Sequence, residues 1–273
     1  MPLFPIDNMD KKQLGRAKEY VSAIGVGTWS IRDYASAREA LKRAIELGLD
    51  QVDTAEMYDS GRAEELVGEV IREVGRERVF VTTKLLPRRF RSPEDAVKGA
   101  KSSLERMGIR FADLILIHWP DPQIPVEVQI RSLEAIAEAQ LTRYLGVSNF
   151  SKRELEVAIT SMKKHEITVN QVKYSAVDRA IEGDLLPYSI REGITIQAYS
   201  PLERGLLARD RLLEYIGRKY ERSPVQVALN FLISRPRVVT IPKSEKPERI
   251  EEFAGALGWR LSERDIEVIE RRL

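Results

Sequence analysis

The sequence contains no cysteine, and only two histidines occur among its 273 residues. Without cysteine the chain can form no disulfide bond, thiolate nucleophile or cysteine-ligated metal centre. The two histidines, His118 and His165, stand far apart without an adjacent carboxylate cluster, so we expect no catalytic metal ion. His165 lies in the polar stretch MKKHE and is expected at the surface.

Long apolar runs are also missing. No run approaches the roughly 20 residues that a membrane-spanning helix requires, and the amino-terminal segment MPLFPIDNMDKK lacks the basic-then-apolar layout of a secretory signal. The 44 Lys and Arg residues are interspersed with 42 acidic residues, which does not favour a nucleic-acid surface. We therefore expect a soluble, cytoplasmic protein that binds neither membrane nor nucleic acid and is a monomer rather than an oligomer.

What the sequence does contain is a regular alternation of strand-like and helix-like segments. Eight short runs are rich in β-branched or apolar residues, as is typical of parallel strands buried on both faces. These runs are Ile24 to Gly27, Gln51 to Ala55, Val79 to Lys84, Leu114 to His118, Tyr144 to Val147, Thr168 to Val172, Thr195 to Tyr199 and Val238 to Ile241. Eight strands alternating with helices predict a single α/β domain over residues 1–273, a (β/α)8 TIM barrel.

Residues at the ends of the expected helices support this prediction. Serines with good N-cap character precede several amphipathic stretches. They are Ser92, Ser151, Ser223 and Ser262. Helical patterns at residues 209–220 and 262–272 exceed a minimal barrel and predict appended helices. The segment before Ile24 has the pattern of a β-hairpin, which we expect to plug the amino-terminal end of the barrel.

Four titratable side chains follow three consecutive expected strands. Asp53 and Tyr58 lie in VDTAEMY, Lys84 ends VFVTTK, and His118 ends LILIH. In a barrel of this class the carboxyl ends of the strands are where catalytic groups converge. The pattern therefore predicts that the four side chains share one site, but it does not by itself indicate a reaction. Taken singly, three of the four also have an ordinary structural alternative: a turn cap for Asp53, packing for Tyr58, and a solvated strand end for Lys84.

A series of short motifs along the chain makes the catalytic interpretation the stronger one. The motifs are GVGTW (Gly25 to Trp29), DTAEMY (Asp53 to Tyr58), the strand-ending Lys84, LIHWP (Leu116 to Pro120), GVSNF (Gly146 to Phe150), NQVKY (Asn170 to Tyr174), YSPL (Tyr199 to Leu202) and IPKS (Ile241 to Ser244), with Arg249 beyond. In this order and spacing the chain resembles the aldo-keto reductase family from end to end. The resemblance implies a barrel that binds NADP(H) without a Rossmann domain and reduces aldehydes and ketones to alcohols. Consistently, no GxGxxG motif is present.

The four side chains suit this chemistry. Hydride delivery to a carbonyl carbon leaves an alkoxide-like oxygen that needs a proton. Tyr58 can be the general acid, assisted by the charge of Lys84, which Asp53 would keep ionised. His118 would orient the carbonyl oxygen and help to relay the proton. In the family, the matching four residues have these roles.

The resemblance also implies the residues that bind the cofactor and the substrate. The cofactor set comprises Ser148, Asn149 and Gln171 at the nicotinamide amide, Tyr199 on its ring, Ser200 and Leu202 at the pyrophosphate, and Lys243, Ser244 and Arg249 at the 2′-phosphate, with Thr28 and Glu252 as further contacts. An Arg fork and a Lys point charge together suit a dianionic phosphate. Trp29 and Trp119 would line an apolar mouth for a small carbonyl substrate, although either could instead be a core residue.

Four positions depart from the residues that are usual in the family: Gln140, Ser175, Glu203 and Phe253. Phe253 replaces a common Asn and leaves either stacking on adenine or simple packing open. Glu203 replaces a Gly and places a negative charge near the expected pyrophosphate. Gln140 replaces a helix-ending Gly, which costs stability if its backbone needs a positive φ.

Two other functions remain open from the sequence. A Schiff-base aldolase using Lys84 would need that side chain free of Asp53, and it leaves the IPKS segment unexplained. A regulatory or sensor subunit that binds NADPH with little turnover is disfavoured by the intact set of four titratable residues.

Overall fold

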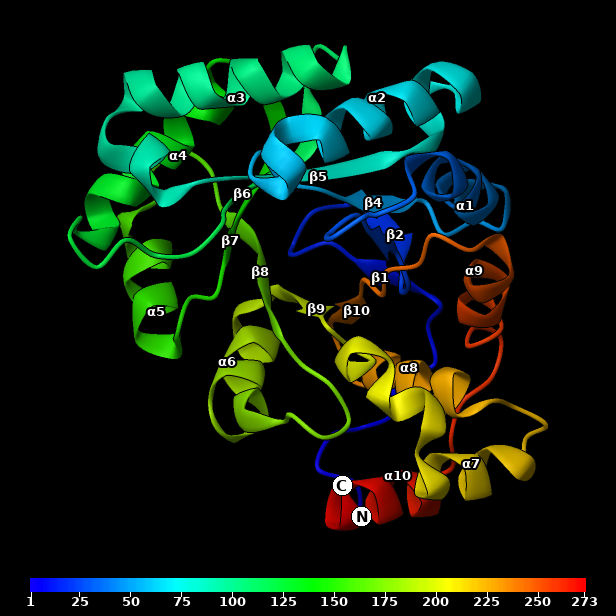
Figure 1. Ribbon diagram of the computed structural model, residues 1–273. Helices are drawn as coiled ribbons and strands as arrows, with labels where there is room; N and C mark the ends of the chain where they lie inside the picture. Colours follow the sequence, from blue (N-terminus) through cyan, green and yellow to red (C-terminus); the bar gives the residue numbers. More distant parts are fainter.

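A closed barrel of eight parallel strands forms the centre of the molecule (Figure 1). The computed structural model describes residues 1–273. The strands follow one another in chain order: β3 (Val26–Gly27), β4 (Gln51–Asp53), β5 (Phe80–Leu85), β6 (Ala112–Ile117), β7 (Thr142–Ser148), β8 (Ile167–Lys173), β9 (Thr195–Tyr199) and β10 (Val238–Thr240). A parallel bridge between Ile24 and Thr240 joins the last strand to the first and closes the barrel. The predicted (β/α)8 fold is confirmed.

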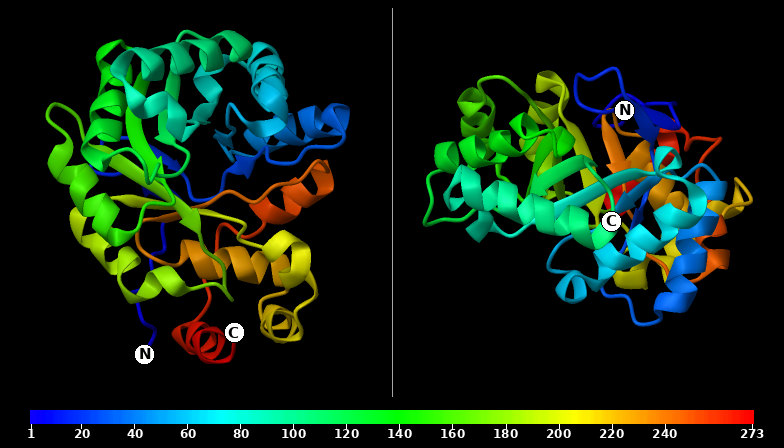
Figure 2. Two further views of the ribbon diagram at one scale, coloured as in Figure 1. Left: turned by 60° about the vertical axis from the view of Figure 1, so that its left-hand side comes forward. Right: turned by 90° about the horizontal axis from the view of Figure 1, so that it is seen from above.

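Helices cover the outside of the strands in all views (Figure 2). They are α1 (Tyr34–Glu46), α2 (Arg62–Val74), α3 (Pro93–Met107), α4 (Val126–Glu138), α5 (Lys152–Ser161), α6 (Leu185–Glu192), α8 (Pro224–Ile233) and α9 (Pro247–Ala254). Two helices are additional, as predicted: α7 (Arg211–Arg218), which is shorter than expected, and α10 (Glu263–Arg272). Short 3-10 helices are η1 (Tyr58–Gly61), η2 (Arg76–Arg78), η3 (Pro87–Arg91), η4 (Ala180–Gly183) and η5 (Glu203–Arg209).

The predicted serine N-caps are all confirmed. Each accepts a hydrogen bond from the backbone N–H three residues further on; they are Ser92, Ser151, Ser223 and Ser262. Such caps satisfy otherwise unpaired donors and stabilise a helix by about 0.5–2 kcal/mol each. They place the start of each helix just after the loop that leaves the barrel.

The hairpin before the barrel closes its amino-terminal end. Strands β1 (Lys11–Gln13) and β2 (Tyr20–Ser22) pair antiparallel. Leu14 and Val21 of this hairpin are buried in one cluster with residues of the barrel interior, namely Phe80, Leu114, Leu116, Val169 and Val239. At Gly15, where φ is +55°, even a Cβ would lie 2.9 Å from the Cα of Thr168. The predicted plug is thus confirmed, and it leaves only the carboxyl end of the barrel open.

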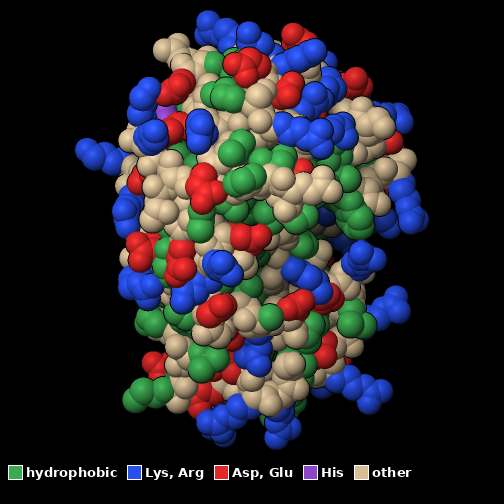
Figure 3. All heavy atoms as spheres, turned by 90° about the vertical axis from the view of Figure 1, so that its left-hand side faces the viewer, with side chains coloured by type: hydrophobic (Ala, Val, Ile, Leu, Met, Phe, Trp, Pro, Cys, Tyr) green, Lys and Arg blue, Asp and Glu red, His purple; other side chains and the backbone are tan.

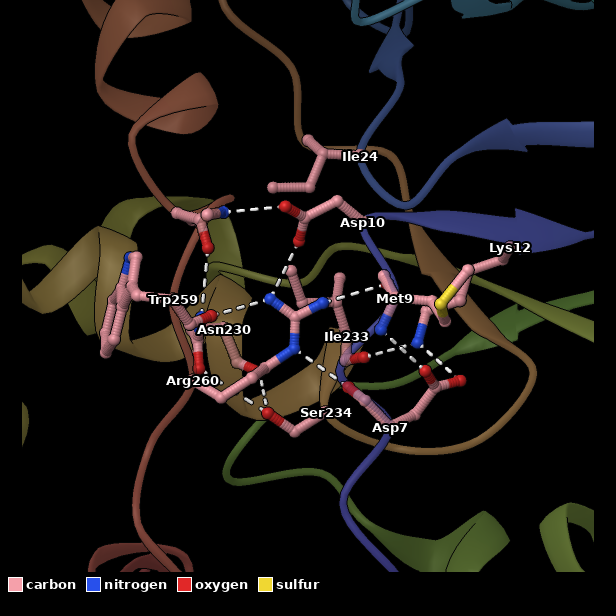
Figure 4. Close-up of polar contacts among 12 residues, drawn as sticks. Asp7, Met9, Asp10, Lys12, Ile24, Asn230, Ile233, Ser234, Trp259 and Arg260 are labelled. Carbon is pink, nitrogen blue, oxygen red and sulfur yellow. Dashed lines mark hydrogen bonds and ion pairs between the residues drawn. The ribbon is translucent and has the colours of Figure 1, made fainter.

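A polar cluster around the buried Lys12 ties the segment before the hairpin to the last helices (Figure 4). Lys12 is 2% exposed, and its Nζ lies 2.7 Å from the Asp7 carboxylate and donates to the Ile233 carbonyl at 2.8 Å. Arg260 pairs with Asp10 at 2.8 Å and donates to the Asp7 carbonyl. Burial lowers the pKa of Lys12 to about 8, although Asp7 acts in the opposite direction.

The two ends of the chain lie beside α10 (Figure 1), where the Met1 ammonium pairs with Glu267 at 2.9 Å. On the face shown in Figure 3, Lys and Arg side chains are interspersed with Asp and Glu. None of the helices combines the length and apolar character needed to cross a lipid bilayer.

Candidate active site

The four residues predicted to be catalytic come together at the open, carboxyl end of the barrel. Asp53 ends β4, Lys84 lies near the end of β5, and His118 directly follows β6. Tyr58 begins η1, immediately after the loop from β4. Because β4, β5 and β6 are neighbours in the barrel, their ends are adjacent.

Lys84 and Asp53 form a buried ion pair. Lys84 Nζ lies 2.6 Å from Asp53 Oδ2 and also donates to the Thr54 carbonyl at 2.8 Å, and both charged residues are at most 2% exposed. Burial alone would lower the pKa of Lys84, but the charge of Asp53 and the nearby Tyr58 outweigh it and raise that pKa above its ordinary value. Lys84 therefore stays an ammonium inside the barrel.

The Tyr58 side chain lies close to both this ammonium and the histidine. Lys84 Nζ is 4.8 Å from the centre of the Tyr58 ring, and the His118 ring meets the Tyr58 ring edge-on at 5.7 Å. Burial raises the pKa of Tyr58, while Lys84 acts in the opposite direction. At neutral pH the phenol is thus protonated and has a stabilising cation beside it.

His118 is neutral over the physiological range. Burial, together with the charge of Lys84, lowers the pKa of His118 to about 3. Its buried Nδ1 has no hydrogen-bond partner. A neutral imidazole can donate a hydrogen bond but carries no extra proton to give, which favours the orienting role expected for His118 over the relay of a proton.

A further pair, not anticipated from the sequence, anchors the loop that carries Tyr58. Glu56 is 8% exposed, accepts a hydrogen bond from the Leu86 backbone at 2.7 Å and pairs with Arg89 at 3.1 Å. Asp59 and Ser60, directly after Tyr58, have φ of 47° and 55°, a conformation that costs energy for residues other than glycine. The only sequence signal was an acidic residue between two site residues in DTAEMY.

Asn149 connects His118 to the predicted cofactor residues on β7 and β9. Its Nδ2 donates to the His118 carbonyl and to Ser148 Oγ, both at 3.1 Å. Its Oδ1 accepts from the Tyr199 hydroxyl at 2.9 Å, and its backbone has a φ of 59°. The structure thus brings Ser148, Asn149 and Tyr199 next to the four predicted catalytic residues.

Gln171 and Thr28 are joined to the four predicted catalytic residues by hydrogen bonds to Asp53. Gln171 Nε2 donates to Asp53 Oδ1 at 2.7 Å, and the Thr28 hydroxyl donates to the Asp53 carbonyl at 3.0 Å. Neither residue is more than 2% exposed. Ser200 and Leu202 lie further out, both half-buried, on the loop between β9 and η5.

The predicted phosphate-binding residues lie after β10, on one loop and the start of α9. Lys243 Nζ donates to the Ser30 carbonyl at 2.9 Å and pairs with Glu245. Ser244 Oγ accepts from the Lys246 backbone at 3.1 Å. Arg249 is exposed and forms no ion pair.

The carboxylate of Glu252, another predicted cofactor residue, is engaged in a hydrogen bond within the protein. Its Oε1 accepts a hydrogen bond from Ser223 Oγ at 2.6 Å, at the start of α8. Its backbone carbonyl also accepts from Gln226 Nε2 at 3.1 Å. Glu252 therefore connects α9 to α8 in this structure.

The four departures from the family pattern receive physical explanations. Phe253 is 2% exposed and packs in the main core, so simple packing is the correct alternative. Glu203 accepts a hydrogen bond from Ser175 Oγ at 2.8 Å, so these two unusual residues are hydrogen-bonded to each other. Glu203 also pairs with Lys173 at 3.3 Å, which compensates its negative charge. Gln140 has a φ of 58°, which confirms that this position needs the left-handed conformation that glycine adopts more easily.

Both tryptophans expected at the substrate mouth are exposed, Trp29 by 51% and Trp119 by 37%. The ring centres of Trp119 and His118 are 4.8 Å apart, which places Trp119 at the catalytic group. The guanidinium of Arg204, in η5, lies 5.5 Å above the Trp29 ring. The core-packing alternative for the two tryptophans is therefore wrong.

A surface hollow of about 440 Å³ lies at the other end of the barrel, beside the hairpin. Arg76 and Arg143 in its wall pair with Asp113 at 2.8 and 2.9 Å, and Arg143 also pairs with Glu19, so the two arginines have two carboxylates as counterions. It contains none of the predicted site residues, and we assign it no role.

Comparisons with known proteins point to one family. The sequence profile of the aldo/keto reductase family matches residues 23–272. Methylglyoxal reductase YeaE of Escherichia coli (strain K12) is 32% identical over 258 residues, covering 91% of this chain and 90% of that protein. Glyoxal reductase of Bacillus subtilis (strain 168) is 34% identical over 248 residues, covering 90% of this chain and 87% of that protein.

Solved structures with a similar level of sequence identity to this chain have the same fold. The thermostable aldo-keto reductase Tm1743, crystallised with the inhibitor epalrestat, has a TM-score of 0.90 at 38% identity and covers 96% of this chain and 99% of its own. An aldo-keto reductase from Klebsiella pneumoniae in complex with NADPH has a TM-score of 0.89 at 30% identity, covering 96% and 95%. Since the profile spans most of the sequence and these relatives cover nearly all of it, the chain belongs to the aldo/keto reductase family.

Proposed function

We propose that this protein, acting as one barrel domain over residues 1–273, reduces aldehydes and ketones to alcohols with NADPH. The observation that carries the proposal is the buried Lys84–Asp53 ion pair beside the ring of Tyr58. The names of its relatives support it, because they include a methylglyoxal reductase and a glyoxal reductase, and the Klebsiella pneumoniae relative was crystallised with NADPH.

The side chains at the open end suit a phosphorylated nicotinamide cofactor. Gln171 Oε1 has no hydrogen-bond partner, although its Nε2 is fully used. This free acceptor, next to the Asn149 amide, suits a carboxamide, which needs both donors and acceptors. Further out, Lys243 and the unpaired Arg249 would hold the 2′-phosphate. Bound NADPH would supply the hydride for the carbonyl carbon.

The chain's own residues would complete the reduction by managing the carbonyl oxygen. Tyr58 gives its phenolic proton to the oxygen as negative charge develops there. Lys84 stabilises the resulting tyrosinate, and Asp53 keeps Lys84 charged. The neutral imidazole of His118 donates a hydrogen bond that orients the oxygen.

The two alternatives are less compatible with the geometry. A Schiff-base aldolase needs a neutral, accessible amine, whereas Lys84 is 1% exposed and its pKa is raised. A sensor that binds NADPH with little turnover would have no use for a proton donor held beside an ion pair. We therefore prefer the reductase.

A single-turnover experiment tests the proposal. The enzyme is mixed with an equal concentration of NADPH, and its oxidation is followed by absorbance in a stopped-flow instrument after addition of methylglyoxal or benzaldehyde. We expect one equivalent of NADPH to be oxidised with either aldehyde, because the mouth near Trp29 and Trp119 offers mainly apolar contact. Binding of NADPH without oxidation by any aldehyde would contradict the proposal and support the sensor.

A further inference from the structure

Three buried glutamines form a continuous hydrogen-bonded chain through the barrel interior. Gln51 on β4, Gln197 on β9 and Gln171 on β8 are each at most 2% exposed. Gln197 Nε2 donates to Gln51 Oε1 at 3.2 Å, and Gln171 Nε2 donates to Gln197 Oε1 at 2.7 Å. Because β10 and β3 separate β9 from β4 in the barrel wall, the link between Gln197 and Gln51 crosses the interior.

Both ends of this chain are groups that can only accept hydrogen bonds. At one end Gln51 Nε2 donates to the backbone carbonyl of Ser22, which belongs to the hairpin that plugs the barrel. At the other end Gln171 Nε2 donates to Asp53 Oδ1 at 2.7 Å. Reversing any one of the three amides would bring two oxygens, or two N–H groups, face to face. All three amides therefore have a single orientation.

The orientation matters because it decides which atom of Gln171 remains available. Both hydrogens of its Nε2 are used, one on Gln197 and one on Asp53, and Oε1 is left without a partner. An amide held by Asp53 alone could rotate about that one contact, whereas the bond to Gln197 fixes its plane. Gln197 is in turn fixed by Gln51.

We propose that Gln51 and Gln197 are positioning residues, which hold Gln171 with Oε1 as the acceptor for the carboxamide of the nicotinamide cofactor and keep its N–H on Asp53. This inference rests on the proposed function, because it concerns how that cofactor is held. Gln51 and Gln197 would touch neither cofactor nor substrate, and they would act only through Gln171.

The test compares two ligands that differ in the nicotinamide half. Dissociation constants for NADPH and for adenosine 2′,5′-bisphosphate, which has the 2′-phosphate but no nicotinamide, are measured by titration calorimetry. Gln197→Met keeps the length of the side chain but removes its donor and acceptor. We expect this variant to bind NADPH about tenfold more weakly, the loss of roughly one hydrogen bond, and adenosine 2′,5′-bisphosphate within about twofold of wild type.

Two further variants separate positioning from a general effect on the barrel. Gln51→Met should weaken NADPH binding in the same selective way, and the double variant should be little worse than Gln197→Met, because the chain acts as a unit. Thr82→Val is the matched control, since Thr82 is fully buried, pairs in register with Asp53 and has a hydroxyl without a partner. It should change neither constant.

Two results would overturn the inference: unchanged NADPH affinity in Gln197→Met and Gln51→Met, or an equal loss for both ligands. The second result would mean that the glutamines support the barrel as a whole. Both measurements omit the carbonyl substrate. If the wild type binds NADPH but oxidises it with no aldehyde, the proposed function is refuted, and the comparison of the two ligands still decides the role of the glutamines.

Discussion

Lys84 and Asp53 form an ion pair of 2.6 Å in which both residues are almost completely shielded from water. The desolvation of two such charges costs several kcal/mol, which their attraction repays only when the geometry is good. The pair lies directly beside Tyr58, so the barrel maintains a costly arrangement at the place where we propose that a proton is transferred.

Removing one partner of this pair should therefore affect both stability and activity. We expect Lys84→Met to abolish aldehyde reduction and to lower the free energy of unfolding by about 3–5 kcal/mol, because Asp53 would remain buried without its counterion. The double variant Asp53→Leu with Lys84→Met should regain much of that stability but no activity. Urea denaturation and single-turnover assays check both parts. Activity in either variant would show that the ammonium is dispensable.

The pH dependence of reduction should come from Tyr58 and not from His118. With its pKa lowered to about 3, His118 does not titrate near neutrality, so we expect kcat/KM to be flat from about pH 5 to pH 8. Reduction needs the protonated phenol, and the pKa of Tyr58 is raised above its ordinary value. Activity should therefore fall only above about pH 10, the ordinary range of tyrosine. A loss of activity centred near pH 6.5 would mean that His118 changes its charge during turnover.

Cofactor choice should depend on Arg249 more than on Lys243. Both cations would contact the 2′-phosphate, but Lys243 already pairs with Glu245, whereas Arg249 has no partner to lose. We expect Arg249→Ala to raise the KM for NADPH by an amount equivalent to about 1.5–3 kcal/mol and to leave that for NADH nearly unchanged. Lys243→Ala should have the smaller effect. Equal losses with NADPH and NADH would show that these residues serve the fold.

The buried Lys12 should make the protein more stable at alkaline pH. The pKa of Lys12 is about 8 in the folded state and 10.5 for an ordinary lysine of the unfolded chain, so between these values the unfolded chain binds more protons. The free energy of unfolding should then rise as the pH increases from 8 to 10.5, by about 3 kcal/mol at most. Urea denaturation across this range compares wild type with Lys12→Met, in which this contribution should disappear. Parallel pH profiles of the two proteins would contradict it.

The meeting of the four predicted catalytic residues could be expected because each lies in a local motif at a strand end, and a parallel barrel brings adjacent strand ends together. Contacts that cross the barrel could not be predicted in the same way. Nothing around Gln51 or Gln197 indicates that their side chains meet, since β4 and β9 are far apart in sequence. The same holds for Glu252, whose partner Ser223 lies on another helix.

The backbone conformation of Gln140 could be predicted, because this residue replaces a helix-ending glycine, and its φ is 58°. Glu203 also replaces a glycine, but there the sequence indicated only the added negative charge and not the φ of 46°. For Phe253 the sequence left packing and adenine stacking open, because an aromatic residue suits either. Its burial in the main core depends on α9, whose position follows from the whole barrel.

Whether Tyr58 donates the proton is tested by the rate of hydride transfer in Tyr58→Phe, followed by stopped-flow absorbance of NADPH with methylglyoxal. Tyr144→Phe is the matched control, because Tyr144 lies on β7 in contact with Glu19 of the hairpin region, away from the catalytic group. We expect Tyr58→Phe to reduce the rate by at least about 10²-fold while the dissociation constant for NADPH stays within about twofold, and Tyr144→Phe to keep its rate. A rate in Tyr58→Phe close to that of the wild type would mean that Tyr58 is not the proton donor.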